Sequence, residues 1–134
     1  MATNIFVNLP VADLPASKAF FEALGFAFNP QFTDETAAAM VIDDNIYSML
    51  LTHEKFRQFT PRAIADAKAT SEVLIAISRD SREAVTALFD KAIAAGGKEV
   101  RPGDDYGFMM SKAFSDLDGH IWEVMWMDPA HVEG

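Results

Sequence analysis

The chain repeats one order of elements twice, and this repetition limits the folds that are open to it. Each half begins with a predicted strand, followed by an acidic residue that can cap a helix and by an amphipathic helix. A glycine follows the helix, and a proline lies five residues after that glycine. The markers of this order are Asp13, Gly25 and Pro30 in the first half and Asp80, Gly97 and Pro102 in the second. Such similarity between two halves is typical of a duplicated unit.

Further strands follow the helix in each half, so the predicted unit is βαβββ. The predicted strands of the first half cover residues 4–9, 26–32, 36–42 and 46–52. Those of the second half cover residues 73–78, a short stretch that ends at Pro102, and residues 106–115 and 120–127. Asp13 is the predicted cap of the first helix, which runs to Leu24, and Asp80 or Ser81 caps the second.

The stretch between the halves breaks this pattern and is interpreted as a connector. Residues 53–59 and 61–67 favour two short helices, the second with Pro61 near its start. We therefore expect one domain over residues 1–134. Its parts are a first unit at about 1–53, a connector at 54–70, a second unit at about 71–127 and a short tail at 128–134.

Length and composition exclude several classes of protein. A chain of 134 residues can bury about two-thirds of its unfolded surface. With 50% hydrophobic residues and no Cys, it is neither disordered nor a disulfide scaffold. The formal charge of −9 argues against nucleic-acid partners, whose phosphates it would repel. No apolar run reaches the roughly 20 residues that span a bilayer, and the first residues lack a basic leader. These features predict a cytoplasmic protein with no membrane partner.

The last predicted strand contains one residue that its surroundings do not explain. The turn Asp-Leu-Asp-Gly at residues 116–119 leads into the run Ile-Trp-Glu-Val-Met-Trp-Met. Because strand side chains alternate, one face carries Trp122, Val124 and Trp126, and Glu123 lies on the other. Burying an unpaired polar group there costs about 2 to 7 kcal/mol. Glu123 therefore has a partner, opens onto a wet cavity or is protonated, or it lies in solvent on a strand at the rim.

Two βαβββ units with these motifs resemble the vicinal-oxygen-chelate superfamily, which includes glyoxalase I, bleomycin-resistance proteins and extradiol dioxygenases. The matching residues are Asp13-Leu14, Ser17, Phe20-Phe21 and Leu24-Gly25-Phe26 in the first half, and Asp116, Asp118-Gly119 and Trp122-Glu123 in the second. Residues 5–10 and 49–56 are similar to a subgroup labelled predicted lactoylglutathione lyase. The resemblance covers nearly the whole chain and is specific for fold but weak for activity.

The resemblance implies an α+β fold in which two βαβββ units form a half-open barrel of mixed sheet with the helices outside. The helix-facing residues would be Ile5, Val7, Leu9, Val73, Ile75, Ile77, Trp122, Val124 and Trp126. The pocket-facing residues would be Phe6, Asn8, Ser48, Leu50, Thr52, Leu74, Ala76 and Glu123. Members of this superfamily often dimerise, so the resemblance also makes a homodimer plausible.

Metal-dependent members of the superfamily place a His, Gln or Glu on the first strand of each unit and a Glu on the last. The corresponding positions of this chain are Phe6, Leu74, Leu50 (or Ser48 under a shifted alignment) and Glu123. Only Glu123 matches, whereas a zinc site uses about three or four protein ligands. His53, His120 and His131 are predicted at a strand end, a turn and the tail, so they do not complete the site. We therefore expect no cofactor, and a divalent metal on Glu123 is the alternative.

The first hypothesis is that the protein binds a small, largely apolar or aromatic molecule in a sheet-lined pocket, with Glu123 as the catalytic or orienting residue. The expected ligand-binding residues are Phe6, Asn8, Leu50, Leu74, Tyr106, Phe108 and Met125. One alternative is a metal-dependent lyase or isomerase of the lactoylglutathione-lyase type, in which Glu72 or His53 is displaced into the site. Another is sequestration of a cationic drug or toxin, which the charge of −9 would attract. Whether the protein is an enzyme stays open.

Overall fold

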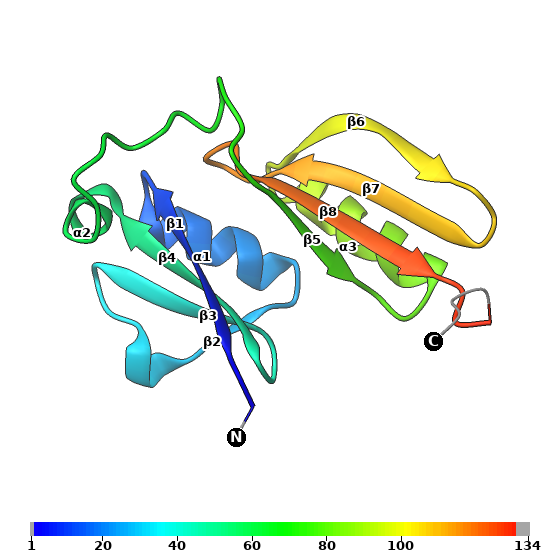
Figure 1. Cartoon of the computed structure of the whole chain (residues 1–134), viewed down its shortest axis with the longest axis horizontal. Helices are drawn as coiled ribbons and strands as arrows, with labels where there is room; N and C mark the ends of the chain where they lie inside the picture. The colour runs from blue at the N-terminus through cyan, green and yellow to red at the C-terminus, as the bar shows by residue number, and fades with distance from the viewer. Residues whose placement is uncertain (1, 131–134) are drawn as a thin grey trace. The chain divides into compact units, whose positions relative to one another are not determined.

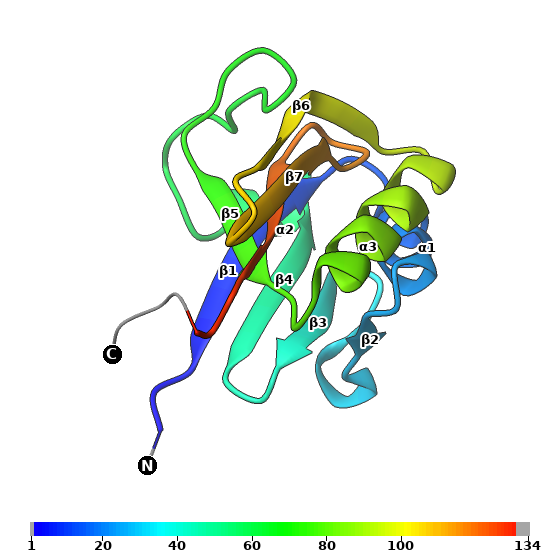
Figure 2. The same ribbon diagram turned by 90° about the vertical axis from the view of Figure 1, so that its right-hand side faces the viewer.

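The computed structural model describes residues 2–130 and contains two compact units (Figures 1 and 2). Unit 1 is Met1–Asp66 and unit 2 is Ala67–Gly134. This division assigns residues 54–66 of the predicted connector to unit 1 and residues 67–70 to unit 2. Residues 131–134 of the predicted tail, including His131, lie outside the described part of the chain.

Unit 1 follows the order strand, helix, three strands, with two short helical segments added. Its elements are β1 (Ile5–Val11), α1 (Leu14–Ala23), β2 (Ala27–Phe28), the 3-10 helix η1 (Pro30–Phe32), β3 (Ala37–Asp43), β4 (Ile46–Thr52) and α2 (His53–Arg57). The strands are ordered β1-β4-β3-β2 across the sheet. Strand β1 is parallel to β4 and the other neighbours are antiparallel, so the sheet is mixed.

Unit 2 repeats this arrangement with a longer helix (Figure 1). Its elements are β5 (Leu74–Ser78), α3 (Arg82–Ala94), β6 (Lys98–Asp105), β7 (Met109–Ser115) and β8 (Ile121–Met127). The strands are ordered β5-β8-β7-β6, and β5 is parallel to β8. Both described sheets are four-stranded, mixed and unclosed. The predicted α+β class and the two βαβββ units are therefore confirmed.

Local side-chain chemistry sets the ends of both long helices. The side chains of Asp13 and Ser81 each accept a hydrogen bond of 3.1 Å from the backbone N–H three residues later. Ser81, and not Asp80, is therefore the cap of α3. Gly25 and Gly96 follow the two helices with φ angles of 104° and 112°, a left-handed conformation that glycine adopts without steric cost. Within residues 2–130, no helix has the length and apolarity needed to cross a membrane.

One face of the sheet in unit 1 forms the core against α1, which packs on β3 and β4. The register pairs Ser48 with Val7 and Leu50 with Leu9, and paired residues of neighbouring strands lie on the same face. Leu50 has an exposed fraction of 0% and belongs to this core. The prediction that placed Ser48, Leu50 and Thr52 on the pocket-facing side is therefore wrong. Both alternating sets of β4 contain apolar residues, so alternation alone does not identify the face that is buried.

The corresponding face of unit 2 packs against α3. Trp122 and Val124 of β8 are buried there, and the guanidinium carbon of Arg82 on α3 lies 5.7 Å from the ring centroid of Trp126. The predicted helix-facing set of β8 is therefore confirmed, and Glu123 points the other way. Ile5 and Val73 were also predicted to face the helices, but both side chains are exposed.

Two predicted elements differ from the structure. The strand predicted over residues 26–32 is limited to β2, because the Asn29 side chain accepts a hydrogen bond from the second residue after it and Pro30 lacks an N–H donor. The helix predicted over residues 61–67 is not formed. That segment offers Ile64 as its only large apolar side chain, so it has no face to bury against a neighbour. The first predicted helix of the connector forms as α2.

Candidate functional site

The register of unit 2 arranges the sheet face opposite α3 in successive rungs. The first rung contains Leu74, Ile121, Ser115 and Lys98, the second Ala76, Glu123, Ala113 and Arg101, and the third Ser78, Met125, Ser111 and Asp104. Neighbouring rungs are two residues apart along β5, β7 and β8, or about 7 Å, and three residues apart along the irregular strand β6. We call this surface the charged face, because the side chains of Arg101, Asp104 and Glu123 are joined on it by salt bridges.

Arg101 is the partner of Glu123. Nη2 of Arg101 donates a hydrogen bond to Oε2 of Glu123 at 2.7 Å, and Nη1 donates to Oδ2 of Asp104 at 3.0 Å. The hydrogen bond to Glu123 is the largest cause that raises the pKa of the Arg101 guanidinium above its usual value. The side chains of Arg101 and Glu123 are 38% and 25% exposed. The carboxylate of Glu123 is thus neutralised by a guanidinium at a surface that a small molecule can reach.

The salt bridge between Arg101 and Glu123 spans a whole strand. Strands β6 and β8 both border β7, so their backbones are separated by two strand spacings, or about 10 Å. Ala113 of β7 is paired with both Arg101 and Glu123, and it is only 1% exposed. A long Arg and a Glu can meet across this distance because the side chain between them is a methyl group.

An irregularity in β6 brings Arg101 and Asp104 to the same face. In a regular strand, residues three apart point to opposite faces. The register of β6 against β7 shifts between Glu99 and Arg101 and again between Arg101 and Asp104, as in a β-bulge. Gly103 lies inside the second shift, where a Cβ atom would come within 2.9 Å of the Ser111 carbonyl oxygen. The close approach of β6 to β7 at this point therefore requires glycine.

The other residues predicted for the site in unit 2 are distributed along the sheet. Met125 lies one rung from Glu123 on the same face. Leu74 lies one rung away in the other direction, on the edge strand β5, and is exposed. Tyr106 and Phe108 form a stacked pair in the β6–β7 hairpin, with ring centroids 6.3 Å apart. Phe108 is five residues from Ala113 along the chain, or about 16 Å, so this pair lies far from the salt bridge.

In unit 1, the face opposite α1 carries a pair of aromatic residues, of which the sequence predicted Phe6 but not Tyr47. Phe6 is 53% exposed, and its ring stacks on that of Tyr47 with centroids 4.9 Å apart and an interplanar angle of 12°. Asn8 is exposed on the same face and is paired with Met49. Tyr47 was not predicted because the parity assigned to β4 placed it on the helix side.

The acidic turn before β8 has a structural role. Oδ1 of Asp116 accepts hydrogen bonds of 3.0 Å from the backbone N–H groups of Asp118 and His120, and Oδ2 accepts one of 3.1 Å from Nε1 of Trp122. Burial is the largest cause that raises the pKa of Asp116. Asp116, one of the residues that carry the superfamily resemblance, thus stabilises the turn through its carboxylate and anchors the buried indole of Trp122 on the following strand.

The residues at the family's metal positions do not fit a metal ion. In unit 2, Leu74 offers no donor atom and the carboxylate of Glu123 is engaged by the Arg101 guanidinium, whose charge repels a cation. In unit 1, Phe6 offers no donor atom and Leu50 is in the core. Within residues 2–130, no group of three or more His, Cys, Asp or Glu side chains is placed to hold a metal.

Arg101 and Asp104 are the functional candidates that sequence reasoning missed. The strand predicted to end at Pro102 was too short to assign Arg101 to a sheet face, and Asp104 lay outside it. A usable signal was present, since the Pro102-Gly103 dipeptide between two charged residues marks a bulge or turn. The pairing of Arg101 with Glu123, which are 22 residues apart, has no local signal.

Comparisons with known proteins agree with this fold. Residues 3–43 match the family described as bleomycin resistance protein-like N-terminal. No curated protein matches the chain.

Several solved structures match over most of the chain. A hypothetical protein from S. aureus is 28% identical with a TM-score of 0.78, covering 94% of this chain and 95% of that one. A glyoxalase-related enzyme from Fulvimarina pelagi is 23% identical with a TM-score of 0.77, covering 94% and 88%. A glyoxalase/bleomycin resistance protein/dioxygenase family enzyme from Burkholderia phytofirmans PsJN is 19% identical with a TM-score of 0.76, covering 94% and 99%. These matches show that the chain has the glyoxalase-like fold. The similarity to the lactoylglutathione lyase subgroup stays a prediction.

Proposed function

We propose that the protein binds a small, largely apolar or aromatic molecule on the charged face of unit 2, and that it does so without the metal centre of metal-dependent relatives. The observation that carries this proposal is the salt bridge from Arg101 to Glu123 across the methyl group of Ala113. It supplies a fixed polar anchor on a floor of small side chains. Met125 and Ile121, one rung to either side of Glu123, supply apolar contacts.

The anchor can recognise a polar group on such a molecule. A guanidinium has five N–H donors, and three bonds from Arg101 are made to Glu123, Asp104 and the carbonyl of Pro102. Five minus three leaves two donors for a ligand. The Glu123 carboxylate supplies acceptor lone pairs beside them. Donors and acceptors placed side by side suit an amide, a carbonyl or a carboxyl group on an aromatic body.

Sequestration of a cationic aromatic compound is a second candidate. Two carboxylates contact one guanidinium in the cluster of Arg101, Asp104 and Glu123, which leaves one net negative charge in that cluster. The match of residues 3–43 to the bleomycin resistance protein-like family and the formal charge of −9 point in the same direction. The two candidates differ in the charge of the ligand. A lyase of the lactoylglutathione type is less well supported, because no group of side chains within residues 2–130 is placed to hold its metal.

The first test is metal content. Protein purified without chelator is analysed for bound metal and then titrated with Zn²⁺, Ni²⁺, Mn²⁺ and Fe²⁺ while the thermal unfolding midpoint is recorded. We expect no stoichiometric metal and no stabilisation, because Glu123 is already paired. One metal per chain, with a stabilisation that disappears in Glu123→Gln, contradicts the proposal.

The second test uses three probes that share a naphthalene ring and differ in charge, namely naphthamide, naphthoate and naphthylmethylamine. Binding is mapped by backbone amide shifts of the labelled protein. We expect shifts centred on Ala113, Glu123 and Met125, and weaker binding in Arg101→Gln. Preference for the amine, with loss of binding in Glu123→Gln, supports the second candidate instead. Shifts that avoid the charged face for all three probes contradict both.

A further inference from the structure

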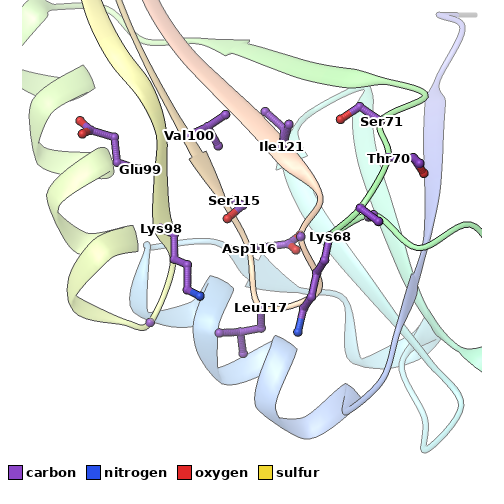
Figure 3. A pocket seen from close by; sticks show the side chains of 14 residues that line it. Lys68, Thr70, Ser71, Lys98, Glu99, Val100, Ser115, Asp116, Leu117 and Ile121 are labelled. Carbon is purple, nitrogen blue, oxygen red and sulfur yellow. The ribbon is translucent and has the colours of Figure 1, made fainter.

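Unit 2 contains a cavity of about 460 Å³ at the end of the sheet where β8 begins (Figure 3). Its walls come from three stretches, which are residues 67–71, the start of β6 with the glycine turn before it, and the β7–β8 turn. The first rung of the charged face, with Ile121, Ser115 and Lys98, forms part of the lining. Neither Arg101 nor Glu123 lines the cavity, so its polar groups differ from those of the proposed ligand site, although Ile121 borders both.

Two walls of the cavity meet in a close backbone contact. Gly119 has a φ of 93°, and a Cβ atom on it would lie 2.8 Å from the Lys68 nitrogen and 2.9 Å from the Ala67 carbonyl carbon. Residues 67–71 can therefore lie directly against the β7–β8 turn only because residue 119 has no side chain. On the other wall, a Cβ atom added to Gly96 would lie 3.3 Å from Cδ2 of Leu117. The segment that roofs the cavity is thus fixed by packing.

Four charged residues line the cavity, and two of them are the lysines Lys68 and Lys98, although the whole chain has a formal charge of −9. The side chains of Lys68 and Lys98 extend toward the same end of the cavity, on either side of Leu117 (Figure 3). Glu99 is paired with Phe114 on the α3 face, and its side chain points away from the two lysines (Figure 3). The carboxylate of Asp116 is already engaged by three N–H donors.

The remaining lining combines apolar walls with hydroxyl groups. Val100, Leu117 and Ile121 supply the apolar surface, and Ser71 and Ser115 supply hydroxyls. A volume of about 460 Å³ falls within the range of roughly 300 to 1,000 Å³ typical of small-molecule pockets. Two ammonium groups at one end of an apolar hollow favour a ligand with a negative head and an apolar body.

We infer that this cavity is a second binding site, which takes a small organic anion. Its ligand carries a carboxylate, sulfonate or phosphate group that contacts the ammonium groups of Lys68 and Lys98. A short apolar or aromatic body contacts Val100, Leu117 and Ile121. The anion would be bound without Arg101, Asp104 or Glu123, so the site is expected to work independently of the salt bridges on the charged face.

The test compares two fluorescent probes with the same ring system, 8-anilinonaphthalene-1-sulfonate and the uncharged N-phenyl-1-naphthylamine. We expect the sulfonate to bind the wild-type protein and to weaken about tenfold in Lys68→Gln/Lys98→Gln, since two partly screened charge contacts are lost. Binding of the uncharged probe is expected to stay unchanged. The matched control is Lys18→Gln/Lys91→Gln, which removes the same charge elsewhere and should leave sulfonate binding within about twofold.

Two further measurements locate the site. Amide shifts caused by the sulfonate should centre on residues 67–71, 98–100 and 115–121, and Ser71→Trp should abolish binding by filling the cavity. Arg101→Gln should leave sulfonate binding unchanged, which separates this site from the charged face. No binding to the wild type, equal weakening in both lysine pairs, or shifts centred elsewhere each overturn the inference.

Discussion

Nη2 of Arg101 lies 2.7 Å from Oε2 of Glu123, although the strands that carry them, β6 and β8, are not neighbours in the sheet. The contact passes over Ala113 of the intervening β7. Glu123, which looked isolated on an apolar strand, therefore has a cationic partner on the same face. Because both side chains are partly exposed, the pair is accessible to a ligand and contributes modestly to stability.

Glu123→Gln tests that modest contribution. We expect the free energy of unfolding to fall by about 1 kcal/mol or less, because partly exposed ion pairs are screened by water. The thermal midpoint should then fall by only a few degrees, at about 2 to 8 °C for each kcal/mol. Urea unfolding measures the change, and Glu99→Gln on β6, which removes a carboxylate from the opposite face of the sheet, is the control. A loss of several kcal/mol in Glu123→Gln alone would show a structural anchor instead.

Ala113→Leu should separate Arg101 from Glu123. The larger side chain would occupy the space beneath the salt bridge, and overpacking of a buried position costs about 1 to 3 kcal/mol. Ala76→Leu is the matched control, since Ala76 lies on the same rung but is exposed on the edge strand β5. Urea unfolding should show destabilisation only for Ala113→Leu. Equal stability of the two variants would mean that Ala113 does not support the bridge.

Asp116→Asn should destabilise unit 2 by removing an acceptor for a buried donor. The Asn amide nitrogen would face Nε1 of Trp122, and a buried N–H left without an acceptor costs about 1 to 3 kcal/mol. A double-mutant cycle with Trp122→Phe measures this contact, because the phenyl ring has no N–H to leave unpaired. The two changes together should cost less than the sum of the single changes. Strict additivity would indicate that the hydrogen bond contributes nothing.

The stability of the protein should depend on pH through Asp116. Burial raises the pKa of this carboxyl above 3.8, while the charge of His120 and the hydrogen bond from Trp122 act in the opposite direction. An acid with a raised pKa in the folded state binds its proton more tightly there, so its contribution is most favourable below pH 3.8 and declines as the pH rises through the folded pKa.

The stability difference between wild type and Asp116→Asn should therefore shift in favour of the wild type as the pH falls from about 7 toward about 4. Urea unfolding at several pH values measures this difference. Repeating the comparison of the Asp116 protein with Asp116→Asn in a His120→Gln background removes the charge of the neighbouring imidazole, which acts on the pKa of Asp116. A difference that moves toward the variant on acidification would mean that Asp116 has a lowered pKa.

Gly119→Ala should be more damaging than Gly107→Ala. Both glycines have positive φ angles, 93° and 84°, so each alanine has to adopt a left-handed conformation, which costs about 1 to 2 kcal/mol. Only at Gly119 would the added Cβ also meet backbone atoms of residues 67 and 68. Thermal unfolding should show a clearly larger loss for Gly119→Ala, and similar losses would mean that residues 67–71 can move away from the turn.

Local chemistry predicted most of the fold. The duplicated order of elements, the Asp13 cap and the glycines that end both helices are each visible within a few residues, and the structure contains them. Alternation along β8 correctly placed Trp122 and Glu123 on opposite faces. The helix predicted over residues 61–67 failed because a short segment is helical only when a neighbour buries one of its faces.

The sequence by itself determined which side chains share a face within one strand, because that depends only on a period of two residues. The tertiary structure decided which face of each strand is buried and which residues of different strands meet. Leu50 was misplaced because β4 is apolar on both faces and only its register with β1 selects one. Arg101 and Glu123 meet because a bulge in β6 and a methyl group on β7 bring two distant strands within reach. Such contacts are properties of strand register, which no single segment encodes.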